Sequence, residues 1–217
     1  MTQRTTGLHR ALSLPWLYQT YQRAIGSHRL WQDIIGRLNL SPGDRLLDIG
    51  CGPGDVVAYL GDVEYVGFDL SEQYVAQARI RHGSARATFF CADVTTVDPA
   101  DLGVFDAVLA HGVLHHVQDD IARSIFELAG KVLKPEGTFV TVDGAYVEGQ
   151  SRMAKFLLDQ DRGTSVRSPD AYVNLGSHVF DQIDIDVDHA CLRIPYTMAI
   201  LCASQPHDAP TRTSNPA

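Results

Sequence analysis

Three closely spaced glycines are the strongest chemical signal in the chain. Gly50, Gly52 and Gly54 directly follow a short apolar run, and a stretch of helical character comes next. Glycine adopts backbone conformations closed to other residues and lets a ligand approach the main chain closely, while the first N–H groups of a helix have no partner within it. The spacing therefore predicts a ligand-binding turn between a strand and a helix. A tight turn without a ligand is the alternative.

Two aspartates close the next two apolar runs. Asp69 lies 19 residues after Gly50, close to the spacing expected of an acid that accepts hydrogen bonds from the hydroxyls of a ribose. Asp93 ends the following run, where its carboxylate could accept a hydrogen bond from the amino group of an adenine. Together with the glycines, the two acids predict an adenosine site. The alternatives are an N-cap on the helix near Ser71 for Asp69 and a turn-forming role for Asp93.

The third glycine distinguishes between two nucleoside cofactors. The dinucleotide fingerprint needs G-x-G-x-x-G, so its third glycine would stand at position 55, where this chain has Asp55. A pyrophosphate would also be repelled by Asp48 and Asp55, which flank the loop. These carboxylates suit a ligand that carries an amine and a sulfonium.

An alternation of short apolar runs and helical stretches must position these residues. Strands buried on both faces of a parallel sheet are apolar along most of their length, and the runs of this kind are 45–50, 65–70, 87–93, 105–110 and 138–143. Helical stretches at 55–60, 71–81 and 119–133 separate them. This order predicts an α/β, Rossmann-like sheet with helices on both faces, whose ligands bind beyond the carboxyl ends of the strands.

Further helices and a hairpin flank this core. Apolar residues at three- and four-residue spacings predict two helices between Leu17 and Leu40, interrupted at Gly26. Two more helices are predicted at 150–161 and 168–180. An antiparallel hairpin follows, in which the first strand alternates apolar residues with aspartates and the second begins after Pro195.

We expect these elements to form a single domain over residues 1–203. Its parts are an N-terminal helical lid (1–40), a cofactor-binding core (41–147), and substrate-side helices with the closing hairpin (148–203). The remaining residues, 204–217, are polar and rich in proline without an apolar period, so they are predicted to be a disordered tail.

The successive motifs resemble those of the class I S-adenosylmethionine-dependent methyltransferases. The segments "LLDIGCGPGD", "YVGFDLS", "CADV", "FDAVLAHGVLHHV" and "LKPEGTFV" stand in the order of that superfamily, and the likeness extends from Arg45 to about Ala203. The resemblance implies a seven-stranded sheet of order 3-2-1-4-5-7-6 with strand 7 antiparallel, which agrees with the predicted hairpin. It also implies S-adenosyl-L-methionine as the cofactor.

Carried over by position, the resemblance implies a set of cofactor-binding residues. The glycine loop would hold the methionine part of the cofactor, Asp69 the ribose, Asp93 the adenine edge, and His111 would line the methyl-donating end. The full set comprises Asp48, Gly50, Cys51, Gly52, Gly54, Asp69, Leu70, Asp93, Val94, Ala110 and His111, together with Tyr21 of the lid, where Tyr18 and Arg23 are further candidates.

Methyl transfer to a hydroxyl requires alignment of the acceptor and removal of its proton. Histidine is the natural base near neutral pH. The catalytic candidates at the ends of the fourth and fifth strands are His111, His115, His116 and Asp143, with Tyr146 close by. The adjacent histidines 115 and 116 recur in superfamily members with different substrates, so a structural or cofactor-side role is the alternative for both.

Two classes of methyltransferase are disfavoured. After the fourth apolar run the chain reads "AHGV", without the "NPPY" pattern of enzymes that methylate amines of nucleobases or glutamine, and without the acidic residue that holds a divalent cation in catechol enzymes. We therefore expect a small-molecule substrate and no metal. Arg162, Arg167 and Tyr172 could bind an anionic or sugar-like acceptor, with solvated arginines as the alternative.

The composition limits partners and location. Of 217 residues, 18 are basic and 26 acidic, and the net charge of −8 opposes nucleic-acid binding. The four cysteines form no closely spaced pair, and no apolar run approaches the roughly 18 residues that span a bilayer. We expect a cytoplasmic protein with reduced thiols and no membrane partner; its oligomeric state stays open. The rival functions are a cofactor-binding protein that does not methylate and an NAD-dependent oxidoreductase, which Asp55 and the hairpin disfavour.

Overall fold

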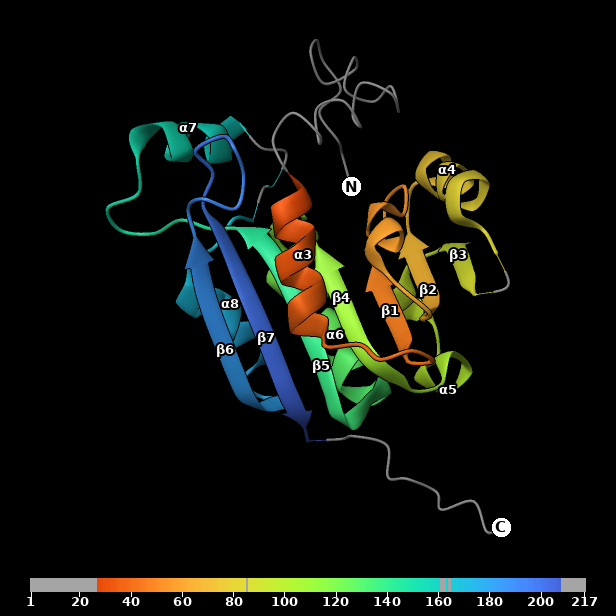
Figure 1. Cartoon of the computed structure of the whole chain (residues 1–217). Coiled ribbons are helices and arrows are strands. Elements are labelled where there is room, and N and C mark those ends of the chain that lie inside the picture. Colours follow the sequence, from red (N-terminus) through yellow and green to blue (C-terminus); the bar gives the residue numbers. More distant parts are fainter. Residues whose placement is uncertain (1–26, 85, 161–162, 164, 208–217) are drawn as a thin grey trace, which may run out of the picture.

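The strands form a single seven-stranded sheet of order β3-β2-β1-β4-β5-β7-β6 (Figure 1). The computed structural model describes residues 27–84, 86–160, 163 and 165–207. The strands are β1 Arg45–Ile49, β2 Glu64–Asp69, β3 Ala87–Cys91, β4 Phe105–His111, β5 Leu133–Gly144, β6 Phe180–Asp188 and β7 Met198–Pro206. Strand β7 runs antiparallel to both of its neighbours, so the predicted order and the predicted hairpin are confirmed.

Helices cover both faces of the sheet (Figure 1). They are α3 Ser27–Leu38, α4 Glu72–His82, α5 Pro99–Leu102, α6 Asp119–Val132, α7 Arg152–Gln160 and α8 Pro169–Gly176, with 3₁₀ turns η1 Asp55–Tyr59, η2 Val94–Thr96 and η3 Leu114–His116. Helices α3 and α4 pack on one face, where Ile34 and Val75 are buried together with Leu109 of β4. Helices α6 and α8 pack on the other, where Phe126 and Leu175 are buried.

Several boundaries differ from the sequence prediction. The helix expected after the glycine loop is only the short 3₁₀ turn η1, because Val56 and Val57 are β-branched and lower the helix propensity of a stretch that is already brief. The helix predicted to reach position 180 ends at Gly176. Strand β7 continues to Pro206, past the predicted boundary at 203, because Ser204 still pairs with β5 and β6 through its main chain.

The N-terminal prediction can be followed only in part. Helix α3 begins at Ser27, directly after the predicted interruption at Gly26. The lid candidates Tyr18, Tyr21 and Arg23 lie outside the described residues. Within the described part of the chain, none of the helices is long and apolar enough to cross a membrane, and the four cysteines are free thiols.

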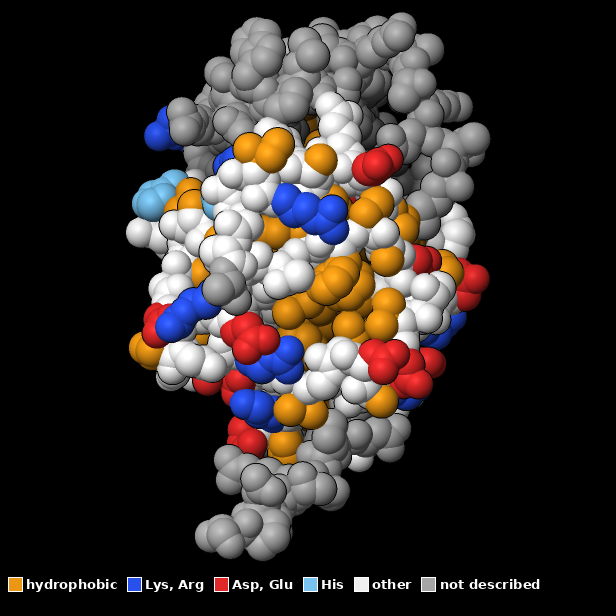
Figure 2. All heavy atoms as spheres, turned by 90° about the vertical axis from the view of Figure 1, so that its right-hand side faces the viewer, with side chains coloured by type: hydrophobic (Ala, Val, Ile, Leu, Met, Phe, Trp, Pro, Cys, Tyr) orange, Lys and Arg blue, Asp and Glu red, His pale blue; other side chains and the backbone are white. Residues whose placement is uncertain are grey.

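The face of the sheet near β3 is only partly covered. Helix α5, which follows β3, has four residues and buries none of them. Phe90 of β3 consequently remains 42% exposed, and its ring stacks on that of Phe68 with centroids 4.9 Å apart. Figure 2 shows hydrophobic side chains gathered on this side of the molecule. A longer helix after β3 would have covered them.

Strand β6 follows the predicted alternation. Ile183 and Ile185 pack against the core, while Asp184 and Asp186 are exposed. The carboxylate of Asp186 accepts a hydrogen bond of 2.7 Å from Arg37 of α3. The period of two therefore separates a core face from a charged face from Ile183 to Asp186, whereas Val187, also predicted on the core face, is 38% exposed.

We expect Ile34→Ala to destabilise the protein by about 2–5 kcal/mol, because its fully buried side chain would leave a cavity between α3 and the sheet. Ile80→Ala is the matched control: this isoleucine is also helical but is 87% exposed, so the change should stay within about 0.5 kcal/mol. Urea unfolding measures both. Equal effects would contradict the described packing of α3.

Candidate functional site

The glycine loop after β1 requires glycine at each of its three positions. Gly50, Gly52 and Gly54 have φ values of 74°, 52° and 76°, in the left-handed region that side chains rarely adopt. A Cβ on Gly50 would also overlap the side chain of Val113. The N–H of Gly50 donates 2.8 Å to the carbonyl of Phe68, so the loop is tied to β2. The prediction of a special backbone in this turn is correct.

Asp69 connects the glycine loop to the start of α4. Its Oδ2 accepts a hydrogen bond of 2.9 Å from the N–H of Gly52, and its Oδ1 accepts one of 2.7 Å from the N–H of Ser71. Ser71 is itself the N-cap of α4, accepting from the N–H of Tyr74. The N-cap alternative for Asp69 is therefore wrong. Each carboxylate oxygen has a second lone pair with which to accept a ligand hydroxyl.

Asp93 has the turn-forming role that was its alternative. Strand β3 ends at Cys91, two residues earlier than predicted, and Asp93 is the N-cap of η2. Its Oδ1 accepts hydrogen bonds from the N–H (3.0 Å) and the hydroxyl (2.6 Å) of Thr95. A contact to adenine stays a prediction. Nearby, Leu70 is 57% exposed, whereas the Val94 side chain is buried in the core.

Beneath the loop, three titratable side chains are buried together. The Asp48 carboxylate accepts a hydrogen bond of 2.6 Å from the Tyr65 hydroxyl. Burial raises the pKa of Asp48 to about 7; the Tyr65 hydrogen bond opposes this shift and the nearby charge of Asp69 adds to it. Burial also raises the pKa of the Cys51 thiol, which makes this thiol unreactive near neutral pH. A cationic group above Asp48 would favour its ionised form.

At the end of β4, the structure separates two neighbouring candidates. Ala110 is fully buried in the core, so its side chain does not line an open site. The His111 ring lies 4.7 Å from that of Trp31 on α3, a contact that the sequence did not suggest. Burial lowers the pKa of His111 to about 4, and its Nε2 has no hydrogen-bond partner among the described residues. This imidazole is therefore neutral near pH 7 and a weak base.

His115 and Asp143 form a buried pair between η3 and the end of β5. Asp143 is 1% exposed, and its Oδ1 accepts from the main-chain N–H of His115 (3.1 Å) and lies 2.7 Å from its Nδ1. Because a carboxylate oxygen can only accept a hydrogen bond, the ring nitrogen Nδ1 carries a proton. The Oδ2 of Asp143 is buried without a partner within the described residues. His116 is exposed, with its ring 4.0 Å from that of His115.

Two predicted acceptor-binding residues are structural instead. The Arg167 side chain is 9% exposed and hydrogen-bonded to main-chain carbonyls and Asp119, so it is neither solvated nor available to an anion. Tyr172 is 1% exposed, and its hydroxyl donates 2.9 Å to the carbonyl of Gly144. Arg162 lies outside the described residues. Residue type alone could not reveal partners that lie 28 to 53 positions away in the sequence.

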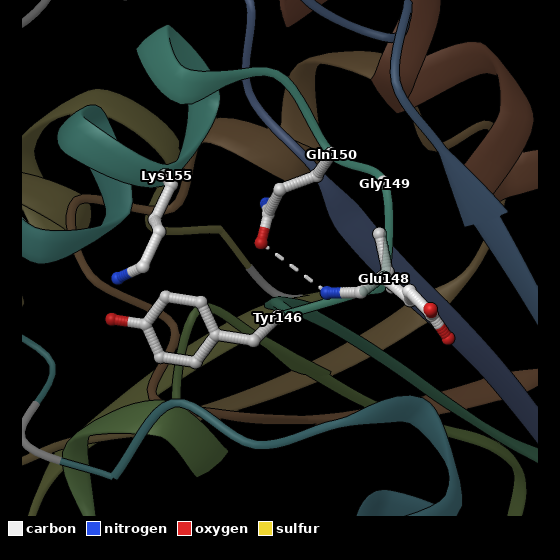
Figure 3. Close-up of a pocket in the computed structure, with 6 residues that line it drawn as sticks. Tyr146, Glu148, Gly149, Gln150 and Lys155 are labelled. Carbon is white, nitrogen blue, oxygen red and sulfur yellow. Dashed lines mark hydrogen bonds between the residues drawn. The ribbon is translucent and has the colours of Figure 1, made fainter.

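A pocket of about 520 Å³ lies beyond the end of β5 (Figure 3). Its lining residues are Tyr146, Val147, Glu148, Gly149, Gln150 and Lys155. The Lys155 ammonium lies 4.9 Å from the centre of the Tyr146 ring, and Asp159 accepts hydrogen bonds from both side chains. The lysine charge beside the pocket is therefore already paired. Among the described residues there is no cluster of His, Cys, Asp or Glu that could hold a metal ion.

Comparison with known sequences finds matches to the central part of the chain. Residues 46–137 match a family described as a methyltransferase domain. An uncharacterized methyltransferase of Synechocystis sp. is 32% identical over 59% of this chain and 63% of its own length. The 27-O-demethylrifamycin SV methyltransferase of Amycolatopsis mediterranei is 37% identical over 53% of this chain and 44% of its own length. A phosphoethanolamine N-methyltransferase of Arabidopsis thaliana is 34% identical over 52% of this chain and 23% of its own length. The matches span less than two thirds of each relative.

Solved structures share the fold at low sequence identity. Human N-acetylserotonin methyltransferase, solved in complex with S-adenosylmethionine, superposes with a TM-score of 0.63 at 19% identity and covers 87% of this chain and 54% of its own. The [4+2]-cyclase SpnF superposes with a TM-score of 0.62 at 22% identity, and the match covers 82% of this chain and 81% of the SpnF chain. These likenesses concern the fold alone.

We expect the stability of the protein to fall with rising pH because of Asp48. The folded state binds the Asp48 proton more tightly than the unfolded chain does, so protonation of Asp48 stabilises the fold. This stabilisation is fully present below pH 3.8 and is lost as the pH rises to about 7. Over that range the free energy of unfolding should fall by up to about 1.4 kcal/mol per pH unit. In Asp48→Asn this part of the slope should disappear. Urea unfolding between pH 4 and 7 measures the difference.

The control for this experiment is Tyr65→Phe. It removes the hydrogen bond that lowers the Asp48 pKa but keeps the carboxyl, so the decline should persist and extend to higher pH. A pH slope in Asp48→Asn equal to that of the unmodified protein would contradict the assignment.

Proposed function

Because the chain carries a class I S-adenosylmethionine-dependent methyltransferase domain, we propose that it transfers the methyl group of this cofactor to a hydroxyl of a small molecule, without a metal ion. The observation that carries the proposal is the buried His115–Asp143 pair at the edge of the sheet where the glycine loop also lies.

The residues around the glycine loop fit the cofactor. The left-handed glycines leave main-chain atoms accessible, and the carboxylate of Asp69 retains lone pairs for the ribose hydroxyls. The exposed side chain of Leu70 suits a planar base, and Asp93 is the N-cap of η2 in the loop after β3. Asp48, whose pKa lies near neutrality, would ionise beside the amine of the methionine part. When bound, S-adenosylmethionine supplies an electrophilic methyl group on a sulfonium.

The acceptor hydroxyl must lose its proton as it is methylated. His115 would take this proton at Nε2, while Asp143 holds the proton on Nδ1 and stabilises the imidazolium that results. Asp143 Oδ2 and His111 Nε2 have no hydrogen-bond partner among the described residues, which supports a ligand with polar groups, because buried polar atoms without partners cost about 1–3 kcal/mol each. His111 then serves as an uncharged lining group, and the exposed His116 lies outside this chemistry.

The remaining alternatives differ in what they predict. The family match and the antiparallel β7 leave no observation in favour of the NAD-dependent oxidoreductase. A cofactor-binding protein that does not methylate stays a rival, since the fold also occurs in a cyclase. The net charge of −8 supports a metabolite rather than a nucleic acid as the acceptor, and a cytoplasmic location stays a prediction.

Asp69→Ala should weaken binding of S-adenosylhomocysteine by about 1–3 kcal/mol, which is about 5- to 150-fold, because the ribose would lose a charged acceptor. Calorimetric titration with S-adenosylhomocysteine, and with NAD as the contrasting ligand, measures this. The matched control is Asp98→Ala, which also removes a carboxylate that accepts one main-chain N–H, but at the N-cap of α5. Undiminished affinity in Asp69→Ala would limit this acid to fastening the loop.

The transfer itself is tested with methyl-labelled cofactor and pools of hydroxyl-bearing metabolites. We expect label in an ether product, and a loss of about 100-fold or more in kcat for His115→Gln, which lacks a base. His178→Gln is the control, since His178 contacts Glu127 on the surface. Tight cofactor binding without label transfer to any pool would favour the non-methylating rival.

A further inference from the structure

The Arg167 guanidinium fastens the segment before α8 to the loop after β4. Its five N–H groups all donate: Nε and Nη2 to Asp119 Oδ1 (2.9 and 2.7 Å), Nη1 to the carbonyls of Leu114 (2.6 Å) and Ser165 (2.9 Å), and Nη2 also to the carbonyl of Val117 (2.8 Å). The planar fork of an arginine can satisfy such a set, whereas lysine presents a point charge. This arginine therefore sets the position of a main-chain segment rather than binding solvent.

The carbonyls that Arg167 holds lie on either side of His115. Leu114 is the residue before it, and Val117 follows two residues later. The main-chain carbonyl of Arg167 accepts a hydrogen bond of 3.1 Å from the N–H of Tyr146, three residues after Asp143. Arg167 is thus bonded both to the loop that carries the histidine and to the segment that continues from the strand carrying its carboxylate.

Gly163 packs directly against the His115 ring. A Cβ at position 163 would overlap Cδ2 of this ring and lie 2.8 Å from the His115 carbonyl oxygen. The same carbonyl accepts a hydrogen bond of 3.0 Å from the N–H of Ser165. The backbone of Gly163 is not left-handed, so it is the space beside the imidazole that excludes a side chain.

Resting on the proposed function, we propose that Gly163 and Arg167 are positioning residues for the reaction, which hold the His115 ring against Asp143. Gly163 limits the ring on one side by close packing, Asp143 holds Nδ1 on the other, and Arg167 fixes the main chain that carries the ring. A shift of the ring would lengthen the 2.7 Å contact to Asp143 and turn Nε2 away from the acceptor. Gly163 and Arg167 are therefore coupled to proton removal through the ring and the main chain of His115.

The test is Gly163→Ala, read by NMR of the full chain labelled with ¹⁵N-histidine. In the unmodified protein we expect a strongly hydrogen-bonded Nδ1–H signal that disappears in His115→Gln, which assigns it. In Gly163→Ala this signal should shift upfield or be lost, because the new methyl group displaces the ring. Arg167→Lys should weaken the same signal. With an acceptor in hand, both variants should lower kcat while the KM for the cofactor is retained.

The matched control is Gly36→Ala. Gly36 lies in α3 with open space around its Cα, so this change adds the same methyl group far from the histidine. An Nδ1–H signal that is unchanged in Gly163→Ala, or that shifts equally in Gly36→Ala, would overturn the proposal. Calorimetric binding of S-adenosylhomocysteine is measured on every variant. Its absence in the unmodified protein would contradict the proposed function, whereas the NMR result would still report on the position of His115.

Discussion

The parallel pairing of β1 with β2 and β4, and of β4 with β5, is the constraint from which the site follows. Parallel strands bring their carboxyl ends to the same edge of a sheet. In register, Ile49 pairs with Phe68, and His111 pairs with Val142. The glycine loop, Asp69 and Asp143 are therefore gathered at one edge, although 93 positions separate Gly50 from Asp143 in the sequence. The parallel pairing is enough to bring these side chains together, provided that the loops after the strands are short enough to keep them at that edge.

The polar groups gathered at this edge of the sheet lower the stability of the folded chain. It holds a buried carboxyl whose pKa lies near neutrality, an imidazole kept neutral by burial, and a carboxylate oxygen without a partner among the described residues. A core of the same size made of apolar groups would be more stable. Strained and unpaired polar groups of this kind persist where the rest of the structure supplies enough stability to offset their cost. Here the rest is a continuous apolar core on both faces of seven strands.

The sequence predicted most of the frame and the part of the site made by the glycine loop. The closing hairpin and the left-handed turn at the three glycines follow from short-range patterns, whereas the strand order was implied by the resemblance to the methyltransferase superfamily. The prediction failed where partners are distant or are main-chain atoms. Three of the five hydrogen bonds of Arg167 reach main-chain carbonyls, which any residue could provide, and the space beside Gly163 exists only once His115 is in place. Likewise, the polar end of β7 pairs with β5 through main-chain hydrogen bonds, and these cannot be predicted from the polar composition of its side chains.

Strand β6 has a consequence for how copies of this protein meet. It is the last strand of the sheet, so one row of its N–H and C=O groups has no neighbouring strand in the described chain. Its exposed Asp184 and Asp186 lie on the face that also meets Arg37. A second copy that tried to continue the sheet here would bring carboxylates against carboxylates, and like charges across a strand pair are unfavourable. The alternation that marks this strand in the sequence therefore also protects the sheet from growing between molecules.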